Sequence, residues 1–312
     1  MSVSHVDIVD LEGAVDRLRR GGVVAIPTET VYGLAASALD PNAVAKVFAI
    51  KGRPTHHPLI VHLAAASQLV GWGHVDRRAE LLARAFWPGP LTLIVPRGPL
   101  ALDAVTGGLD TVGVRVPAHP VALALLERFG GGLAAPSANR FGFVSPTSAE
   151  HVASDLAGED IGLLDGGPCE VGIESTIVDV SGERPAILRL GAISRDAVEA
   201  TLGEPVEVAL HAARAKAPGQ LASHYAPRAR LEVVPAERLD ERRLELAHVE
   251  GEGRVVVLAA LGASPAEWAR NLYAALRVAD AGGPAAILIA TPPEGPMRDA
   301  VVDRLSRASA PR

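Results

Sequence analysis

The chain has 312 residues, of which 48% are hydrophobic and 21% are charged, a composition that excludes a disordered or fibrous protein. At roughly 150 residues per domain, this length favours two domains. The formal charge is −6, so the molecule as a whole does not attract nucleic acid, and RNA binding is disfavoured as its main role.

Cysteine content and the lack of long apolar runs bear on the compartment. The single cysteine, Cys169, has no partner for an internal disulfide and excludes a cysteine zinc cage. No apolar run reaches the roughly 18 residues of a membrane span. Residues 1–13 show no basic segment followed by an apolar one. We therefore expect a cytoplasmic protein without membrane contact.

Strand and helix patterns alternate through residues 1–203 and predict an α/β domain. Asp40-Pro41 opens a helix that Gly52 ends, and the pair Thr147 and Glu150 predicts a capping box that starts another helix. The pattern also predicts strands at 23–26, 91–95 and 111–116, a helix at 76–87 and a β-hairpin at 175–190.

A second, smaller domain is predicted at 229–312, after a proline-interrupted linker at 204–228. Trp268, Leu272 and Leu276 follow the period of a helix and mark its buried face. The predicted elements are strands at 231–234, 254–259 and 285–290 and helices that start near 264 and 297. Their order favours a three-layer α/β domain.

Short hydroxyl side chains directly follow the first buried strand. Thr28 and Thr30 flank Glu29 at what should be the carboxyl edge of the sheet, where α/β proteins usually bind ligands. A capped turn beside a buried Tyr32 explains the same residues without a ligand.

Two cations, Lys51 and Arg53, flank Gly52 where a predicted helix ends. Arg supplies a fork and Lys a point charge, so the pair can bind phosphate oxygens. Cations that favour the helix dipole are an equally good explanation. His56, His57 and His62 have no carboxylates nearby in sequence, which disfavours a metal site.

Further basic residues recur beside small hydroxyls. Arg115 shares a strand face with Thr111 and Gly113, Ser137 and Ser145 flank one loop, and Arg189 follows the loop 165–176. Each could be a solvated strand face or a turn. Together they predict a polyphosphate site that stabilises developing charge and supplies no protein nucleophile.

Five strings in order resemble the YrdC-like family, and the two-domain layout resembles its long form. They are PTETVYGL at 27–34, KGRP at 51–54, PLIVH at 58–62, PSAN at 136–139, and DGG with GIEST at 165–176. The linker string HYAP at 224–227 is similar to the one that joins the family's two domains. His57 stands where the family motif usually has Asn. The resemblance implies an open, twisted mixed α/β sheet with helices, and a linker that reaches over the active site to a small Rossmann-like domain.

The resemblance implies a nucleotidyltransferase reaction. L-threonine, bicarbonate (or CO₂) and ATP would give threonylcarbamoyl-AMP and pyrophosphate, with Mg²⁺ arriving on ATP and no dedicated protein metal site. The product would pass to a tRNA threonylcarbamoyl transferase complex that forms N6-threonylcarbamoyladenosine at position 37 of ANN-decoding tRNAs. A weak tRNA contact is also implied. The alternative is an RNA-binding module of the same fold without adenylating activity.

The same resemblance implies roles for individual positions, with Lys51 and Arg53 as the catalytic phosphate-binding pair. The implied threonine contacts are Thr30, His62, Arg115, Ala135 and Ser175. The implied ATP contacts are Lys51, Arg53, His57, Thr111, Ser137, Ser145, Arg189 and Tyr225.

Overall fold

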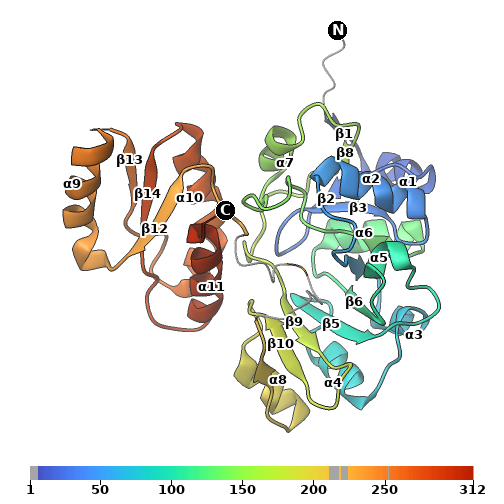
Figure 1. Ribbon diagram of the computed structural model, residues 1–312. Coiled ribbons are helices and arrows are strands. Elements are labelled where there is room, and N and C mark those ends of the chain that lie inside the picture. Colours follow the sequence, from blue (N-terminus) through green and yellow to red (C-terminus); the bar gives the residue numbers. More distant parts are fainter. Residues whose placement is uncertain (1–5, 211–217, 219–223, 252, 312) are drawn as a thin grey trace.

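The computed structural model describes residues 6–210, 218, 224–251 and 253–311. Within these residues, eleven strands form one mixed sheet and three form a second, parallel sheet (Figure 1). The large sheet has the order β1-β8-β2-β3-β7-β4-β6-β5-β9-β10-β11 and the small sheet the order β12-β14-β13. The predicted fold class, two α/β units with a mixed sheet in the first, is confirmed.

The strands of the large sheet are short. They are β1 (Asp7–Ile8), β2 (Val24–Ile26), β3 (Gly33–Ser37), β4 (Ile60–His62), β5 (Leu91–Pro96), β6 (Thr111–Arg115), β7 (Leu133–Ala134), β8 (Gly162–Leu163), β9 (Thr176–Asp179), β10 (Ala186–Arg189) and β11 (Glu207–Val208). The helices around it are α1 (Leu11–Arg19), α2 (Pro41–Lys51), α3 (Leu69–Trp72), α4 (Arg77–Phe86), α5 (Asp103–Thr106), α6 (Pro120–Phe129), α7 (Ala149–Asp155) and α8 (Arg195–Leu202), with a 3₁₀ turn at Ala66–Gln68.

Strand register brings polar residues from distant segments together. β4 and β6 run parallel with His62 opposite Arg115, so these two residues end neighbouring strands at the same edge. β7 runs antiparallel to β4 and leads into Ala135. β9 begins immediately after Ser175 and runs parallel to β5. The large sheet therefore collects the ends of several strands at one place.

Local capping follows the sequence closely at α2. The Asp40 carboxylate accepts hydrogen bonds from the amides of Asn42 and Ala43, and Gly52 ends the helix with φ 63°, a conformation that glycine adopts without strain. The predicted capping box at Thr147 is wrong by one residue. Ser148 caps α7 by accepting from the amide of His151, because the backbone enters the helix one position later than the Thr–Glu spacing indicates.

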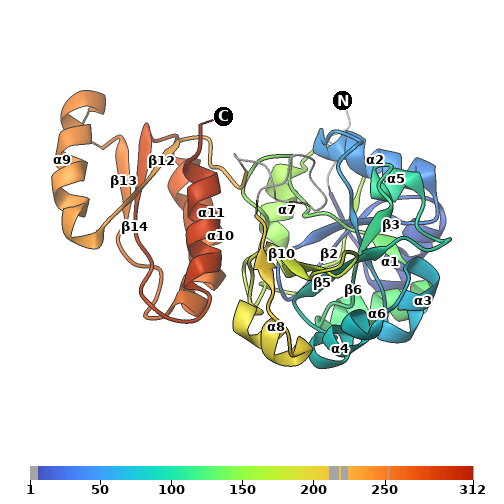
Figure 2. The same ribbon diagram turned by 60° about the horizontal axis from the view of Figure 1, so that its bottom comes forward.

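The second unit consists of β12 (Arg230–Val234), β13 (Val255–Leu258), β14 (Ala286–Ala290), α9 (Leu239–Glu250), α10 (Pro265–Ala281), α11 (Arg298–Ser309) and a 3₁₀ turn at Ala236–Arg238. Its sheet separates α9 from α10 and α11, and the last two helices face the first unit in both views (Figures 1 and 2). The predicted buried face of α10 is confirmed, because Trp268, Leu272 and Leu276 are each at most 2% exposed.

The chain passes from the large sheet to the small one between β11 and β12. Strand β11, at 207–208, lies past the predicted limit of 203 and pairs with β10, so the large sheet extends into residues assigned to the linker. Linker residues 211–217 and 219–223 lie outside the described residues. The limits 1–203, 204–228 and 229–312 stay predictions. Among the described helices, none is both long and apolar enough to cross a membrane.

Candidate active site

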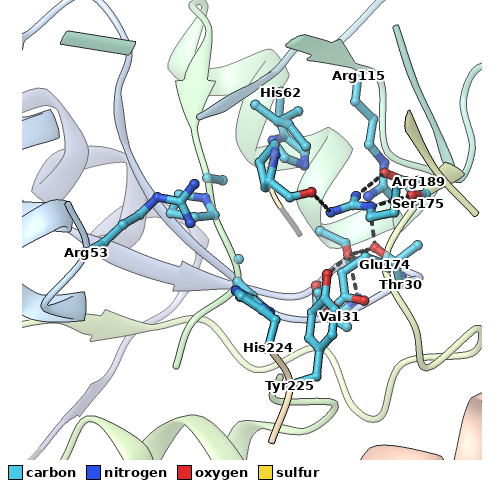
Figure 3. Close-up of a pocket in the computed structure, with 17 residues that line it drawn as sticks. Thr30, Val31, Arg53, His62, Arg115, Glu174, Ser175, Arg189, His224 and Tyr225 are labelled. Carbon is cyan, nitrogen blue, oxygen red and sulfur yellow. Dashed lines mark hydrogen bonds between the residues drawn. The ribbon is translucent and has the colours of Figure 1, made fainter. Parts of the chain in front are cut away.

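A pocket opens where the strand ends converge (Figure 3). Arg53 lies on one side of it and Arg115 and Arg189 on the other. The lining residues are Thr28, Thr30, Val31, Gly33, Arg53, Ile60, His62, Arg115, Ala135, Pro136, Ser137, Glu174, Ser175, Arg189, Pro218, His224 and Tyr225. The pocket therefore holds three guanidinium groups among hydroxyl side chains.

The turn after β2 binds Arg115. Thr28 Oγ1 accepts the amides of Thr30 and Val31 at 3.2 Å each, which fixes the turn. Arg115 donates through Nη1 to Thr30 Oγ1 at 2.9 Å and through Nη2 to Glu29 Oε1 at 2.6 Å. Its Nε donates to the Gly89 carbonyl at 3.2 Å. A guanidinium has five N–H groups, so two remain for a ligand after these contacts of the described chain.

Arg53 follows the αL glycine that ends α2, and its side chain points into the pocket. Its Nη2 donates to the Pro58 carbonyl at 3.0 Å, while the buried Nε has no partner among the described residues. The guanidinium also lies 5.4 Å from the centre of the Phe141 ring. Burial lowers the pKa of Arg53 to about 10, so the group remains a cation at neutral pH and is able to bind an anion.

Lys51 is buried but does not line the pocket. Its ammonium donates to the carbonyls of Ser137 and Asn139, the second at 2.7 Å. Burial, followed by the nearby Arg53, lowers the pKa of Lys51. Lys51 therefore fixes the loop that presents Ser137, and its predicted contact with phosphate stays a prediction.

Ser175 and Arg189 meet across the hairpin of β9 and β10. Arg189 donates through Nε to the Ser175 carbonyl and through Nη2 to its hydroxyl, both at 2.9 Å. The close passage depends on Gly191, where a Cβ would lie 2.4 Å from the Thr176 amide nitrogen. Gly191, two residues after Arg189, thus allows the hairpin to hold this arginine against Ser175.

Two buried histidines in the pocket are neutral. Burial, followed by Arg115, lowers the pKa of His62 to about 3. Burial also lowers the pKa of His224 to about 3, with Glu174 opposing the shift and Arg53 adding to it. The Nδ1 atoms of both rings have no hydrogen-bond partner in the described part of the chain. Each ring therefore contributes to the pocket wall without adding a positive charge.

The structure brings most of the predicted site residues to this pocket. Those that line it are Thr30, Arg53, His62, Arg115, Ala135, Ser137, Ser175, Arg189 and Tyr225. Lys51, His57, Thr111 and Ser145 do not. Their predicted ligand contacts have no support from this placement.

The physical reasons differ for the remaining three. Thr111 lies opposite Pro96 at the far end of β6, and four residues of strand separate it from Arg115 by about 13 Å. The Ser145 hydroxyl donates to Glu174 Oε1 at 2.6 Å. His57 packs edge-on against Phe141, with 5.5 Å between ring centres, and burial lowers the pKa of His57 to about 4. None of the three lines the pocket.

Two carboxylates were missed as site residues, although both stand inside the motifs. Glu29 binds Arg115, and Glu174 lines the pocket and accepts from Ser145, Tyr273 and Arg304. The only sequence signal was an acidic residue beside a small hydroxyl residue. Burial raises the pKa of Glu174, but Arg304 and Arg189 outweigh it and the net pKa is lowered.

Metal-binding side chains do not gather in the described residues: no group of three or more His, Cys, Asp or Glu is placed to hold an ion. Both carboxylates beside the pocket are ion-paired with arginines. A Mg²⁺ ion that arrived on a nucleotide would be held mainly by the phosphates, which is the usual mode for this cation, and its presence here stays a prediction.

Two protein-family models match the chain. The model described as "Telomere recombination" matches residues 16–191, and "Threonylcarbamoyl-AMP synthase, C-terminal domain" matches residues 193–310. Threonylcarbamoyl-AMP synthase of Pyrococcus abyssi is 43% identical over 314 residues, or 95% of this chain and 92% of that protein. The Bacillus subtilis protein of the same name is 41% identical over 317 residues, or 95% and 91%.

A solved structure of P. abyssi Sua5 complexed with L-threonine superposes with a TM-score of 0.89 at 39% identity and covers 97% of each chain. Matches of this extent and a shared two-unit architecture define a two-domain enzyme of the nucleotidyltransferase type. The chain belongs to the family of threonylcarbamoyl-AMP synthases, the long form of the YrdC-like family.

Proposed function

We propose that this enzyme makes threonylcarbamoyl-AMP and pyrophosphate from L-threonine, bicarbonate (or CO₂) and ATP. The observation that carries the proposal is the convergence of Arg53, Arg115 and Arg189 on one pocket that also presents hydroxyls and a neutral imidazole. The P. abyssi relative was crystallised with L-threonine, which supports threonine as one of the substrates.

The amino acid would bind on the Arg115 side. Two unused N–H groups of Arg115 suit its carboxylate. The Thr30 hydroxyl accepts from Arg115 and the Ser175 hydroxyl accepts from Arg189, so both hydroxyls are held in place. His62 lines this side of the pocket and is neutral, so it would not repel a protonated amine or add charge beside a free one. The site thus matches the carboxylate of the amino acid with a cation and leaves its amine beside a neutral ring.

The reaction proceeds in two steps that conserve atoms and charge. The free amine of threonine attacks the carbon of CO₂ and loses a proton to solvent water, giving a carbamate. A carbamate oxygen then attacks the α-phosphorus of ATP, the bond to the bridging α–β oxygen breaks, and pyrophosphate leaves. Arg53 and Arg189 would neutralise charge on the phosphates. Positioning therefore accounts for catalysis without a protein nucleophile.

Mg²⁺ would enter bound to ATP and help neutralise the leaving pyrophosphate. We further propose that the protein works in the cytoplasm and passes its product to a tRNA threonylcarbamoyl transferase complex. That complex would form N6-threonylcarbamoyladenosine at position 37 of ANN-decoding tRNAs. A weak contact with tRNA belongs to the same proposal.

The test is pyrophosphate release by the purified protein with ATP and bicarbonate, with and without L-threonine. Threonine-dependent release is expected, and L-valine should fail because it lacks the hydroxyl that the site hydrogen-bonds. Release without threonine would indicate another acceptor. RNA binding that survives Arg53→Met, with no release under any condition, would favour a binding module and overturn the proposal.

A further inference from the structure

Two side chains of the second domain reach the wall of the pocket. Tyr273 of α10 donates its hydroxyl to Glu174 Oε2 at 3.0 Å, and Arg304 of α11 donates Nε to the same oxygen at 2.8 Å. Tyr273 and Arg304 are 0% exposed and Glu174 is 6% exposed. Figures 1 and 2 show both helices on the side of the second domain that faces the first.

Glu174 connects these side chains to the pocket. Its other oxygen accepts from the Ser145 hydroxyl at 2.6 Å, and the next residue, Ser175, lines the pocket and binds Arg189. Arg304 also donates through Nη2 to the Leu190 carbonyl at 2.8 Å. One guanidinium therefore holds both the segment that carries Ser175 and the segment that carries Arg189.

The backbone of the loop 172–176, called here the pocket loop, also packs against α10. A Cβ at Gly172, whose φ is +81°, would lie 2.4 Å from Arg270 Cα and 2.5 Å from the Ala269 carbonyl oxygen. Only glycine permits so close an approach in that conformation. The loop 172–176 thus packs in close contact with a helix of the other domain.

Arg304 is itself fixed in place. Its Nη1 pairs with Asp303 at 2.7 Å, and Asp303 pairs in turn with Arg307 at 3.0 Å. The guanidinium lies 5.1 Å from the centre of the Tyr225 ring, a residue that lines the pocket. A buried arginine held from several sides keeps its geometry and that of the carboxylate it binds.

We propose that Arg304 and Tyr273 are positioning residues of the active site, which hold Glu174 so that Ser175 and Arg189 are set for threonine and ATP. The second domain is then a working part of the site and not an appended module. This inference rests on the proposed function above for the identity of the two substrates.

The matched control is another ion pair between the domains. Arg277 of α10 binds Asp155 of α7 through two hydrogen bonds of 2.8 and 2.6 Å. Asp155 does not line the pocket or contact Glu174. Asp155→Asn therefore weakens the same interface while the hydrogen bonds from Ser145, Tyr273 and Arg304 to Glu174 stay in place.

The first test compares Tyr273→Phe with Asp155→Asn in the full-length enzyme. Tyr273→Phe removes one oxygen and keeps the ring, and we expect the KM values for L-threonine and ATP to rise about tenfold, equivalent to about 1.4 kcal/mol. The change in kcat should be less than threefold. Asp155→Asn should leave both KM values within twofold of wild type while lowering Tm.

The second test is rescue. Arg304→Met leaves Glu174 as a buried carboxylate without this cation, so Tm should fall and both KM values should rise. Glu174→Gln removes that charge, and the double variant should regain Tm but not the wild-type KM. The double variant keeps the other groups that face position 174, which are Ser145, Arg189, His224, Tyr225 and Tyr273.

The outcomes separate the two proposals. Wild-type KM values in Tyr273→Phe, with only Tm lowered, would show that the second domain stabilises the fold and does not position the site. An equal KM rise in Asp155→Asn would show a general loosening of the interface and also overturn the inference. A wild-type enzyme without threonine-dependent pyrophosphate release overturns the proposed function. In that case calorimetry of L-threonine binding to wild type and to Tyr273→Phe decides the positioning role. Equal affinities of the two proteins, or no binding by either, would reject that role.

Discussion

Arg115→Met tests the buried ion pair beneath the proposed threonine site. Arg115 is 4% exposed and Glu29 6% exposed, and their charged groups lie 2.6 Å apart. The second oxygen of Glu29 has no hydrogen-bond partner within the described residues. Removing the guanidinium leaves a buried carboxylate without its cation, which costs about 3–5 kcal/mol of unfolding free energy.

Urea unfolding followed by circular dichroism measures this loss. With an m-value of about 2 kcal/mol per M, the transition of the first domain should move down by about 2 M. The control is Arg97→Met, which breaks an ion pair with the 78%-exposed Asp103 side chain and should cost less than about 1 kcal/mol. Adding Glu29→Gln to Arg115→Met removes the uncompensated charge and should recover at least half of the loss.

Binding then separates stability from function. The double variant should fold but bind L-threonine at least tenfold more weakly than wild type by calorimetry, because the two N–H groups left for the carboxylate are gone. If Arg115→Met is as stable as Arg97→Met, the argument from the buried pair is wrong. Wild-type threonine affinity in the double variant would refute Arg115 as the carboxylate contact.

Three further predictions concern other buried groups. Burial lowers the pKa of His62 from 6.5 to about 3. Between these pH values the unfolded chain binds one proton more than the folded protein, so the free energy of unfolding falls as pH drops from 6.5 towards 3. The Tm of His62→Gln should therefore fall less than the Tm of wild type between pH 6.5 and 4.5. Lys51→Met frees the carbonyls of Ser137 and Asn139, so the Kd for ATP should rise about tenfold while that for threonine stays within twofold; equal losses would contradict this division. Burial raises the pKa of Cys169 to about 12, so iodoacetamide at pH 8 should label it only after denaturation, and rapid labelling of the folded protein would contradict that burial.

Local elements were predictable where one short segment carries all the information. The Asp40 cap and the Gly52 terminus of α2 follow from side-chain and backbone preferences within a dozen residues. The hydrophobic alternation of 111–116 appears in the structure as β6, and the stripe of Trp268, Leu272 and Leu276 is the buried face of α10. At Thr147 the same type of argument was one residue off, since capping also depends on where the backbone turns.

The motifs identified most residues of the candidate site but not their partners. Arg53, Arg115 and Arg189 could be named because a cation beside glycine and small hydroxyls is a recognisable pattern, and all three line the pocket. Thr111 could not be excluded from its sequence, because a strand face does not show which of its ends reaches the ligand.

The sequence by itself determined the two α/β units, their short-range caps and strands, and the family motifs, because these depend on periodicity and on residues close together in the chain. Only the tertiary structure decided that Glu29 binds Arg115, 86 residues away, and that Glu174 binds Arg304, 130 residues away. Such pairs form only after distant segments have packed together, and burial then gives the paired charges their large energetic effect. The role that we infer for the second domain comes from contacts of this kind.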